Sequence, residues 1–132
     1  MTELAHQTHV KEIERIVEHL CEDWTNDKLE NIERYYHPHA VAVIPGLSRK
    51  ISGIEEIIEN YRDFIEEAEV MEFDILDLLV DLFETTAIAY FNYRIKYKVD
   101  ETTYTEGNTD VLVFRQHDTD WQIVWRTQLI GQ

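Results

Sequence analysis

The sequence predicts an α+β fold in which helices come first and a run of long antiparallel strands follows. Apolar residues recur every three or four positions in the first half of the chain, and from residue 70 onward the period changes to two. Neither a repeat nor a linker interrupts the 132 residues, a length typical of one domain. We therefore expect a single domain over residues 1–132.

Three helices are predicted. The first covers residues 9–24, where apolar side chains form one stripe. The members of this stripe are Val10, Ile13, Ile16, Val17, Leu20, Cys21 and Trp24. Residues 25–27, Thr-Asn-Asp, break the stripe and suit the cap of a short second helix, which we expect to end at Pro38. The third helix, residues 54–68, has isoleucines on one side and glutamates on the other.

The remaining segments predict strands and turns. "AVAVIP" reads as a short strand stopped by Pro45-Gly46, and "SRKISG" reads as an irregular connection. Hairpin turns are expected at "KVDETT" and "RQHDTDW". The later strands are expected near residues 70–83, 86–99, 103–115 and 120–129.

Alternation along these strands assigns side chains to faces. Phe91 and Tyr93 share one face with Ala87, Ala89, Ile95 and Tyr97, whereas Thr86, Ile88, Tyr90, Asn92, Arg94 and Lys96 share the other. In the last strand, alternation puts Trp125 with Trp121 and Ile123, opposite Arg126. Neither face is purely polar, so we expect one face to cover the core and the other to meet a ligand or a second subunit.

Composition excludes several partners. Twelve Lys and Arg against 27 Asp and Glu give a formal charge of −15, which repels a phosphate backbone and an anionic membrane. No apolar run approaches the roughly 20 residues that span a bilayer. The start is polar, without the apolar core of a signal peptide, so we expect a cytoplasmic protein. Cys21 is the single cysteine, and we interpret it as a small buried apolar residue on the helical stripe.

Two stretches, "YYHPHAVAVIPG…ISGIEEI" and "DVLVFRQHDTDWQIVWRTQ", resemble the nuclear transport factor 2-like superfamily. This superfamily contains the SnoaL-like polyketide cyclases, the ketosteroid isomerases, scytalone dehydratase and the association domain of calmodulin-dependent kinase. The resemblance extends from about Val10 to Gln128. It implies a cone-shaped, cystatin-like fold, in which a bent antiparallel sheet wraps the long helix around an open cavity. It also implies a homodimer through the outer face of the sheet.

The resemblance preserves only part of the isomerase site. Ile44 occupies the position that resembles that of the general base, an aspartate in the isomerases, and Leu20 replaces their tyrosine donor. Asp110, in "DVLVF", matches their oxyanion-hole carboxylic acid. One of three roles is kept, so we do not expect isomerase activity of that type.

Two histidines, His37 and His39, flank Pro38. An i, i+2 pair in an extended segment can present both imidazoles to a metal, but no third ligand is evident, and we expect no metal. We interpret the pair as the corner between helix and strand. His39 remains a candidate acid or base at the cavity mouth, because histidine titrates near neutral pH.

Asp110 is the main candidate for the site. Alternation places it with Leu112 and Phe114, on the face that the resemblance turns into the cone. A carboxylate in an apolar cavity needs a cationic partner or must be neutral, and Arg94 on the neighbouring strand is the expected partner. The pair would anchor a small ligand, or it would be a structural ion pair at a sheet edge. The expected pocket residues are Trp24, Tyr36, Ile44, Tyr61, Tyr90, Asn92, Arg94, Leu112 and Trp125.

These sequence features predict two alternative functions. The first is a pocket for a small, largely apolar organic molecule, with Asp110 and His39 as catalytic candidates if proton transfer occurs there, and without a cofactor. It requires a cavity of at least ~300 Å³ reaching Asp110. The second is a non-catalytic association module that uses the sheet face. Arg126, if buried in the sheet or the dimer face, would need a partner such as Asp74, Asp77 or Asp81.

Overall fold

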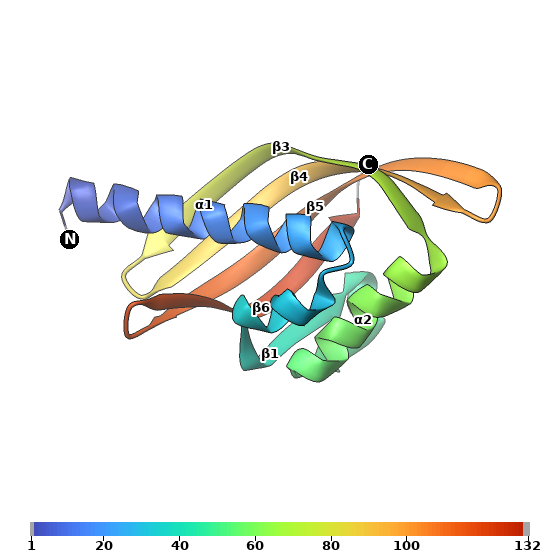
Figure 1. The fold of residues 1–132 in the computed structure, drawn as a ribbon. Helices are drawn as coiled ribbons and strands as arrows, with labels where there is room; N and C mark the ends of the chain where they lie inside the picture. Colours follow the sequence, from blue (N-terminus) through green and yellow to red (C-terminus); the bar gives the residue numbers. More distant parts are fainter. Residues whose placement is uncertain (1, 131–132) are drawn as a thin grey trace.

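The computed structural model describes residues 2–130. Two helices and two short 3₁₀ helices lie with six strands that form one sheet (Figure 1). The helical elements are α1 (Glu3–Thr25), η1 (Leu29–Arg34), η2 (Pro45–Leu47) and α2 (Ile54–Glu67). The strands are β1 (Tyr36–Ile44), β2 (Arg49–Ser52), β3 (Glu69–Phe83), β4 (Thr86–Val99), β5 (Thr102–His117) and β6 (Asp120–Ile130).

The sheet is curved and unclosed, with the strand order β2-β1-β6-β5-β4-β3. The helices lie on one side of this sheet, and α1 runs across it (Figure 1). The prediction of an α+β fold with helices packed in a bent sheet is therefore confirmed. One part of it needs correction, because β1 and β6 pair in parallel, with Ala42 opposite Arg126. The sheet is mixed and not wholly antiparallel.

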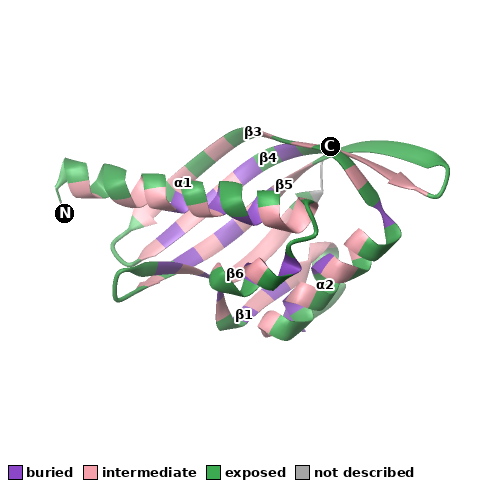
Figure 2. Ribbon diagram, in the orientation of Figure 1, coloured by how far each residue is buried: buried purple, intermediate pink, exposed green. Residues whose placement is uncertain are grey.

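The long helix α1 forms the centre of the core. Thr2 caps it by accepting a hydrogen bond from the backbone N–H of Ala5 at 3.0 Å. The predicted stripe faces the sheet, and its central part is fully buried, whereas the opposite face of the helix is exposed (Figure 2). The buried members of the stripe are Ile13, Val17, Leu20 and Cys21.

Two local predictions are wrong. The short second helix, η1, ends at Arg34, and β1 already begins at Tyr36, two residues before Pro38. The connection "SRKISG" contains the strand β2, which pairs with β1 through Ile51 opposite Ala42. Ile51 is its only buried residue, so four residues carry too little alternation to be recognised as a strand.

A β-bulge changes which side of β6 faces the core. Val113 pairs with Trp125 and Phe114 pairs with Ile123, which leaves Val124 as the extra residue. Before the bulge, Trp121 and Ile123 face the core, as predicted. Beyond it, Arg126 lies opposite the buried Leu112, and Trp125 turns to the outer face. The alternation predicted for residues 120–129 is therefore wrong in its second half.

No helix among the described residues is long and apolar enough to cross a membrane.

Candidate functional site

A cavity of about 200 Å³ lies between the two helices and the inner face of the sheet. It reaches Asp110, but it does not meet the volume of at least ~300 Å³ that the pocket function was expected to require. The end of α1, the middle of α2 and strands β4, β5 and β6 all contribute side chains. Its lining residues are Trp24, Asn60, Tyr61, Phe64, Tyr93, Ile95, Tyr97, Glu106, Asn108, Asp110, Arg126 and Gln128.

An ion pair between Arg126 and Asp110 forms the floor of this cavity. One guanidinium nitrogen, Nη2, lies 3.2 Å from Oδ2 of Asp110, and the two side chains are only 17% and 12% exposed. The amide of Gln128 donates to the other carboxylate oxygen, Oδ1, at 3.0 Å. Both oxygens of Asp110 therefore already accept hydrogen bonds from the protein, so this carboxylate is held in place.

Two tyrosine hydroxyls sit on the other side of the guanidinium. Arg126 Nη1 donates to the hydroxyl of Tyr36 at 3.0 Å and also donates to that of Tyr61. The two hydroxyls lie 2.8 Å apart. Burial would lower the pKa of Arg126, but charge interactions with Tyr36, Tyr61 and Asp110 outweigh it and raise that pKa. The guanidinium is therefore permanently charged, and it joins all three groups into one network.

Aromatic rings form the walls. Trp24 packs against Tyr61 with ring centroids 5.7 Å apart and meets the edge of Phe64 at 5.9 Å. Phe64 also meets Tyr97 at 5.1 Å, and the hydroxyl of Tyr97 donates to Glu106 at 2.7 Å. The cavity thus combines apolar walls with a hydrogen-bonding floor, the usual construction of a small-molecule site.

Alkaline solution is expected to destabilise the protein through buried acids that keep their protons. Burial raises the pKa of the Cys21 thiol from 9.0 to about 12, and burial also raises the pKa of Tyr61 well above its ordinary value. The unfolded chain releases these protons at lower pH than the folded chain does. Stability is therefore full below pH 9 and falls as the pH rises, by about 1.4 kcal/mol per pH unit for each retained proton.

Urea unfolding between pH 7 and pH 11 measures this slope. A Cys21→Ala variant should lose the part of the slope that begins near pH 9, although its stability at pH 7 is also lower. A free energy of unfolding that stays constant up to pH 11 would contradict the assignment.

Of the residues predicted for the pocket, three line the cavity: Trp24, Tyr61 and Asp110. Tyr36 lies directly behind the lining, where it bonds to Tyr61 and Arg126. Leu112 is buried in the core on the same face of β5 as Asp110.

Three other predicted residues lie on the outer face of β4 and pair with acids of β3. Arg94 Nη2 lies 3.3 Å from Oδ2 of Asp74, so it is not the partner of Asp110, and that prediction is wrong. Asn92 donates to Asp77 at 3.3 Å, and the hydroxyl of Tyr90 donates to Asp81 at 3.0 Å. The three acids expected as partners of Arg126 are therefore bound to other side chains, because Arg126 faces the cone.

The last three predicted residues also lie apart from the cavity. Trp125 lies on the outer face beyond the bulge. Ile44 lies by Pro45 and Leu47 in a separate surface hollow. His39 is exposed, and its backbone N–H donates to Nδ1 of His37 at 3.0 Å. Among the described residues, no group of three or more His, Cys, Asp or Glu side chains is arranged to hold a metal ion.

Arg126 is the central residue that sequence reasoning placed elsewhere. Regular alternation assigns it to the outer face, and only the bulge at Val124 brings it inside. A signal was nonetheless present, because Arg126 is the one Lys or Arg among residues 120–130. Asp110, on a neighbouring strand, is the carboxylate whose burial requires such a partner.

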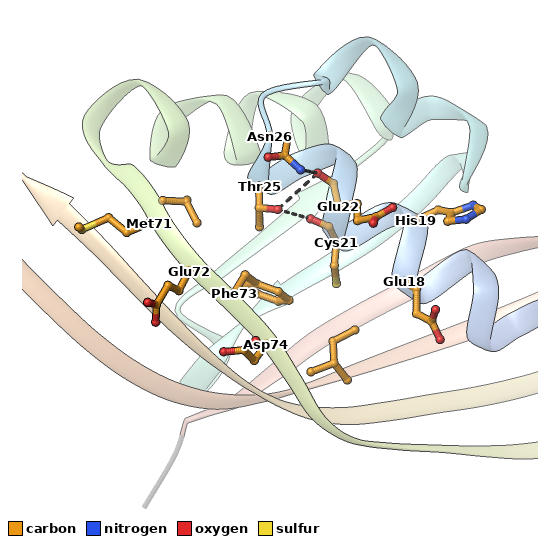
Figure 3. A pocket seen from close by; sticks show the side chains of 12 residues that line it. Glu18, His19, Cys21, Glu22, Thr25, Asn26, Met71, Glu72, Phe73 and Asp74 are labelled. Atoms are coloured by element: carbon orange, nitrogen blue, oxygen red, sulfur yellow. Dashed lines mark hydrogen bonds between the residues drawn. The ribbon is translucent and has the colours of Figure 1, made fainter.

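A larger hollow of about 510 Å³ lies between the last turns of α1 and β3 (Figure 3). Acidic side chains of both elements, Glu18 and Glu22 on α1 and Glu72 and Asp74 on β3, surround it and are exposed to solvent. Thr25 and Asn26, which bond to carbonyl oxygens of α1, close its end (Figure 3). We prefer the smaller cavity as the site, because its polar groups are buried and converge on one point.

The fold and the cavity define the class of protein: a nuclear transport factor 2-like cone with a polar floor. A family model described as a SnoaL-like domain matches residues 13–127, so the chain belongs to the SnoaL-like domain family. No curated protein matches the sequence.

Solved structures share the fold. A nuclear transport factor 2-like superfamily protein from Salmonella enterica superposes with a TM-score of 0.83 at 14% identity, covering 96% of this chain and 94% of that one. A ketosteroid isomerase-like protein from Erwinia carotovora atroseptica gives 0.76 at 14% identity, with 91% and 94% covered. The association domain of C. elegans CaMKII gives 0.76 at 16% identity, with 95% and 98% covered. At these identities the likeness shows the fold alone.

Proposed function

We propose that the protein binds a small, largely apolar organic molecule in the cone, with a carbonyl or hydroxyl oxygen of that molecule on the floor. The observation that carries this proposal is the buried pair of Arg126 and Asp110, set among tyrosine hydroxyls at the base of an aromatic-walled cavity. The two charges cancel, so the floor offers hydrogen bonds without a net charge. A neutral ligand fits this floor better than an ion does.

The size of the cavity limits the ligand further. About 200 Å³ is below the ~300–1,000 Å³ typical of pockets for drug-sized molecules. The walls of Trp24, Phe64 and Tyr97 favour a flat, apolar body. A single ring or a short branched chain with one polar oxygen meets both conditions.

The chemistry that this floor supports is stabilisation of negative charge on the ligand oxygen. Arg126 and the Tyr61 hydroxyl are donors, and the raised pKa of Tyr61, caused mainly by burial, keeps that hydroxyl protonated. Asp110 positions Arg126, because its two oxygens accept hydrogen bonds from Arg126 and Gln128. Such a site favours loss of a proton from the carbon next to a carbonyl to a base supplied by the solvent, because it stabilises the enolate oxygen that results.

A second candidate function is association through the outer face of the sheet. Leu79 and Phe83, on β3, are 57% and 60% exposed, beside a row of carboxylates. One structural neighbour is an association domain, which supports this alternative by fold. In both cases we propose a cytoplasmic protein, on the basis of its single cysteine.

A thermal-shift screen of small neutral carbonyl compounds and alcohols tests the first function. A ligand at 100 times its Kd should stabilise the protein by about 2.7 kcal/mol. Tyr61→Phe keeps the ring but removes one hydrogen bond, and should weaken binding by about 2- to 12-fold. Tyr90→Phe, on the outer face, is the matched control and should leave binding unchanged.

Proton transfer is read in the same system by deuterium exchange at the carbon next to the carbonyl of a bound compound, followed by NMR. Exchange that Tyr61→Phe slows supports catalysis. If no compound shifts the melting temperature and the protein sediments as a defined oligomer, the pocket proposal fails and the association function is favoured.

A further inference from the structure

A second cleft lies outside the cone, where β1, β5 and β6 meet. Its volume is about 300 Å³, and the residues that line it are His37, Pro38, Arg115, Gln116, His117, Gln122 and Val124. Arg115 follows the buried Phe114 and pairs with Gln122 across the sheet, so its side chain lies on the outer face, away from the cone. The cleft is therefore independent of the site proposed above.

The lining of this cleft is unusual for so acidic a chain. It contains a guanidinium, two imidazoles and two amides but no carboxylate, although the sequence has 27 Asp and Glu. Two other cations that line cavities, Arg126 and Lys98, lie beside acidic side chains. Arg126 is neutralised by Asp110, and Lys98 lies in a hollow lined by acids such as Glu69 and Asp100.

Arg115 and His37 both have hydrogen-bond donors that can bind a ligand in the cleft. Within residues 2–130, Arg115 forms no ion pair with a carboxylate. His37 accepts the backbone N–H of His39 on Nδ1 at 3.0 Å, so its remaining proton is on Nε2, which is a donor. Two acids lie at the edge of the cleft: Asp118, whose Oδ2 lies 3.8 Å from Nε2 of His117, and Asp120, which pairs with His117 across the turn.

We propose that this cleft binds an anion that presents two or more terminal oxygens, a carboxylate or a phosphate. A guanidinium matches the spacing of two such oxygens and binds them through parallel hydrogen bonds. His37 and His117 supply further donors from neighbouring positions in the cleft. Asp118 works against the anion, because its own carboxylate competes for His117.

Histidine NMR signals test the proposal on the intact chain. Inorganic phosphate and acetate are titrated separately, with sodium chloride at matched ionic strength as the control. The ring signals of His37 and His117 should shift and saturate, whereas those of His6 and His19, on α1, should not. Saturation by phosphate alone identifies a phosphate site, and saturation by acetate alone or by both identifies a general oxyanion site.

Three variants sharpen the test. Arg115→Gln should weaken binding by about 10- to 100-fold, the effect of losing charge-assisted hydrogen bonds. Asp118→Asn should strengthen it, and asparagine tolerates the positive φ of 57° at this turn. Arg15→Gln, on the exposed side of α1, is the matched control. The proposal is overturned if neither anion saturates the two signals, if Arg115→Gln binds like the wild type, or if Asp118→Asn binds more weakly.

Discussion

Replacing Arg126 with methionine is expected to lower the free energy of unfolding by about 3–5 kcal/mol. The substitution leaves the carboxylate of Asp110 buried, with Gln128 as its remaining donor. It also removes the donor shared by the hydroxyls of Tyr36 and Tyr61. Because small domains are stable by only about 5–15 kcal/mol, this is a large fraction of the total. Urea unfolding monitored by tryptophan fluorescence and circular dichroism measures it.

A double substitution separates the ion pair from general damage. Arg126→Met with Asp110→Leu removes both charges, and apolar replacement of a buried pair is often close to neutral. The double variant should therefore be more stable than the sum of the single effects predicts. If the methionine variant does not fold, the free energy of unfolding is measured for Arg126→Lys, which keeps the positive charge. A loss below about 1 kcal/mol for Arg126→Met would show that the pair does not hold the floor together.

Replacing Phe114 with alanine is expected to cost about 3–5 kcal/mol. Phe114 is completely buried on β5, between Ala87 on β4 and Ile123 on β6. These strands are fixed by hydrogen bonds, so the surroundings cannot collapse fully into the space that the ring leaves. The same unfolding experiment measures the loss.

Phe83→Ala is the matched control, because Phe83 is 60% exposed at the end of β3. Its replacement should change stability by no more than about 0.5 kcal/mol. If both variants lost the same stability, Phe83 would have to be buried in solution, as it would be in an oligomer formed through the outer face.

Most elements of the fold could be predicted, because the hydrophobic period reports directly on burial. The stripe from Ile13 to Cys21 and the alternation from Ala87 to Ile95 identify α1 and β4. The structure buries the expected side of α1, whereas on β4 it buries the side opposite the residues that were expected in the pocket. The strand β2 was missed because a single buried residue, Ile51, gives no period at all. The parallel pairing of β1 with β6 was missed because alternation does not encode strand direction.

The site was predictable only in part. Asp110 and Tyr61, two of the residues expected at the pocket, line the cavity, since each lies on a regular element whose inner face is set by its neighbours. Arg126, the partner of Asp110, was predicted on the outer face. The one extra residue in β6 reverses the face of the sheet on which each later side chain of that strand lies. Arg126 then enters the cone and Trp125 leaves it. No feature of single-strand periodicity reveals such an insertion, which is defined only by the pairing of two strands.

The position of β6 has a consequence for how the protein is made. The last strand of the chain lies inside the sheet, between β5 and β1, and pairs with both. During translation, the first third of the chain therefore emerges without the neighbour that must cover one edge of β1. The sheet can be completed only once residues 120–130 have left the ribosome, and a chain that stops short of them would be cut through the middle of its sheet and not at a margin.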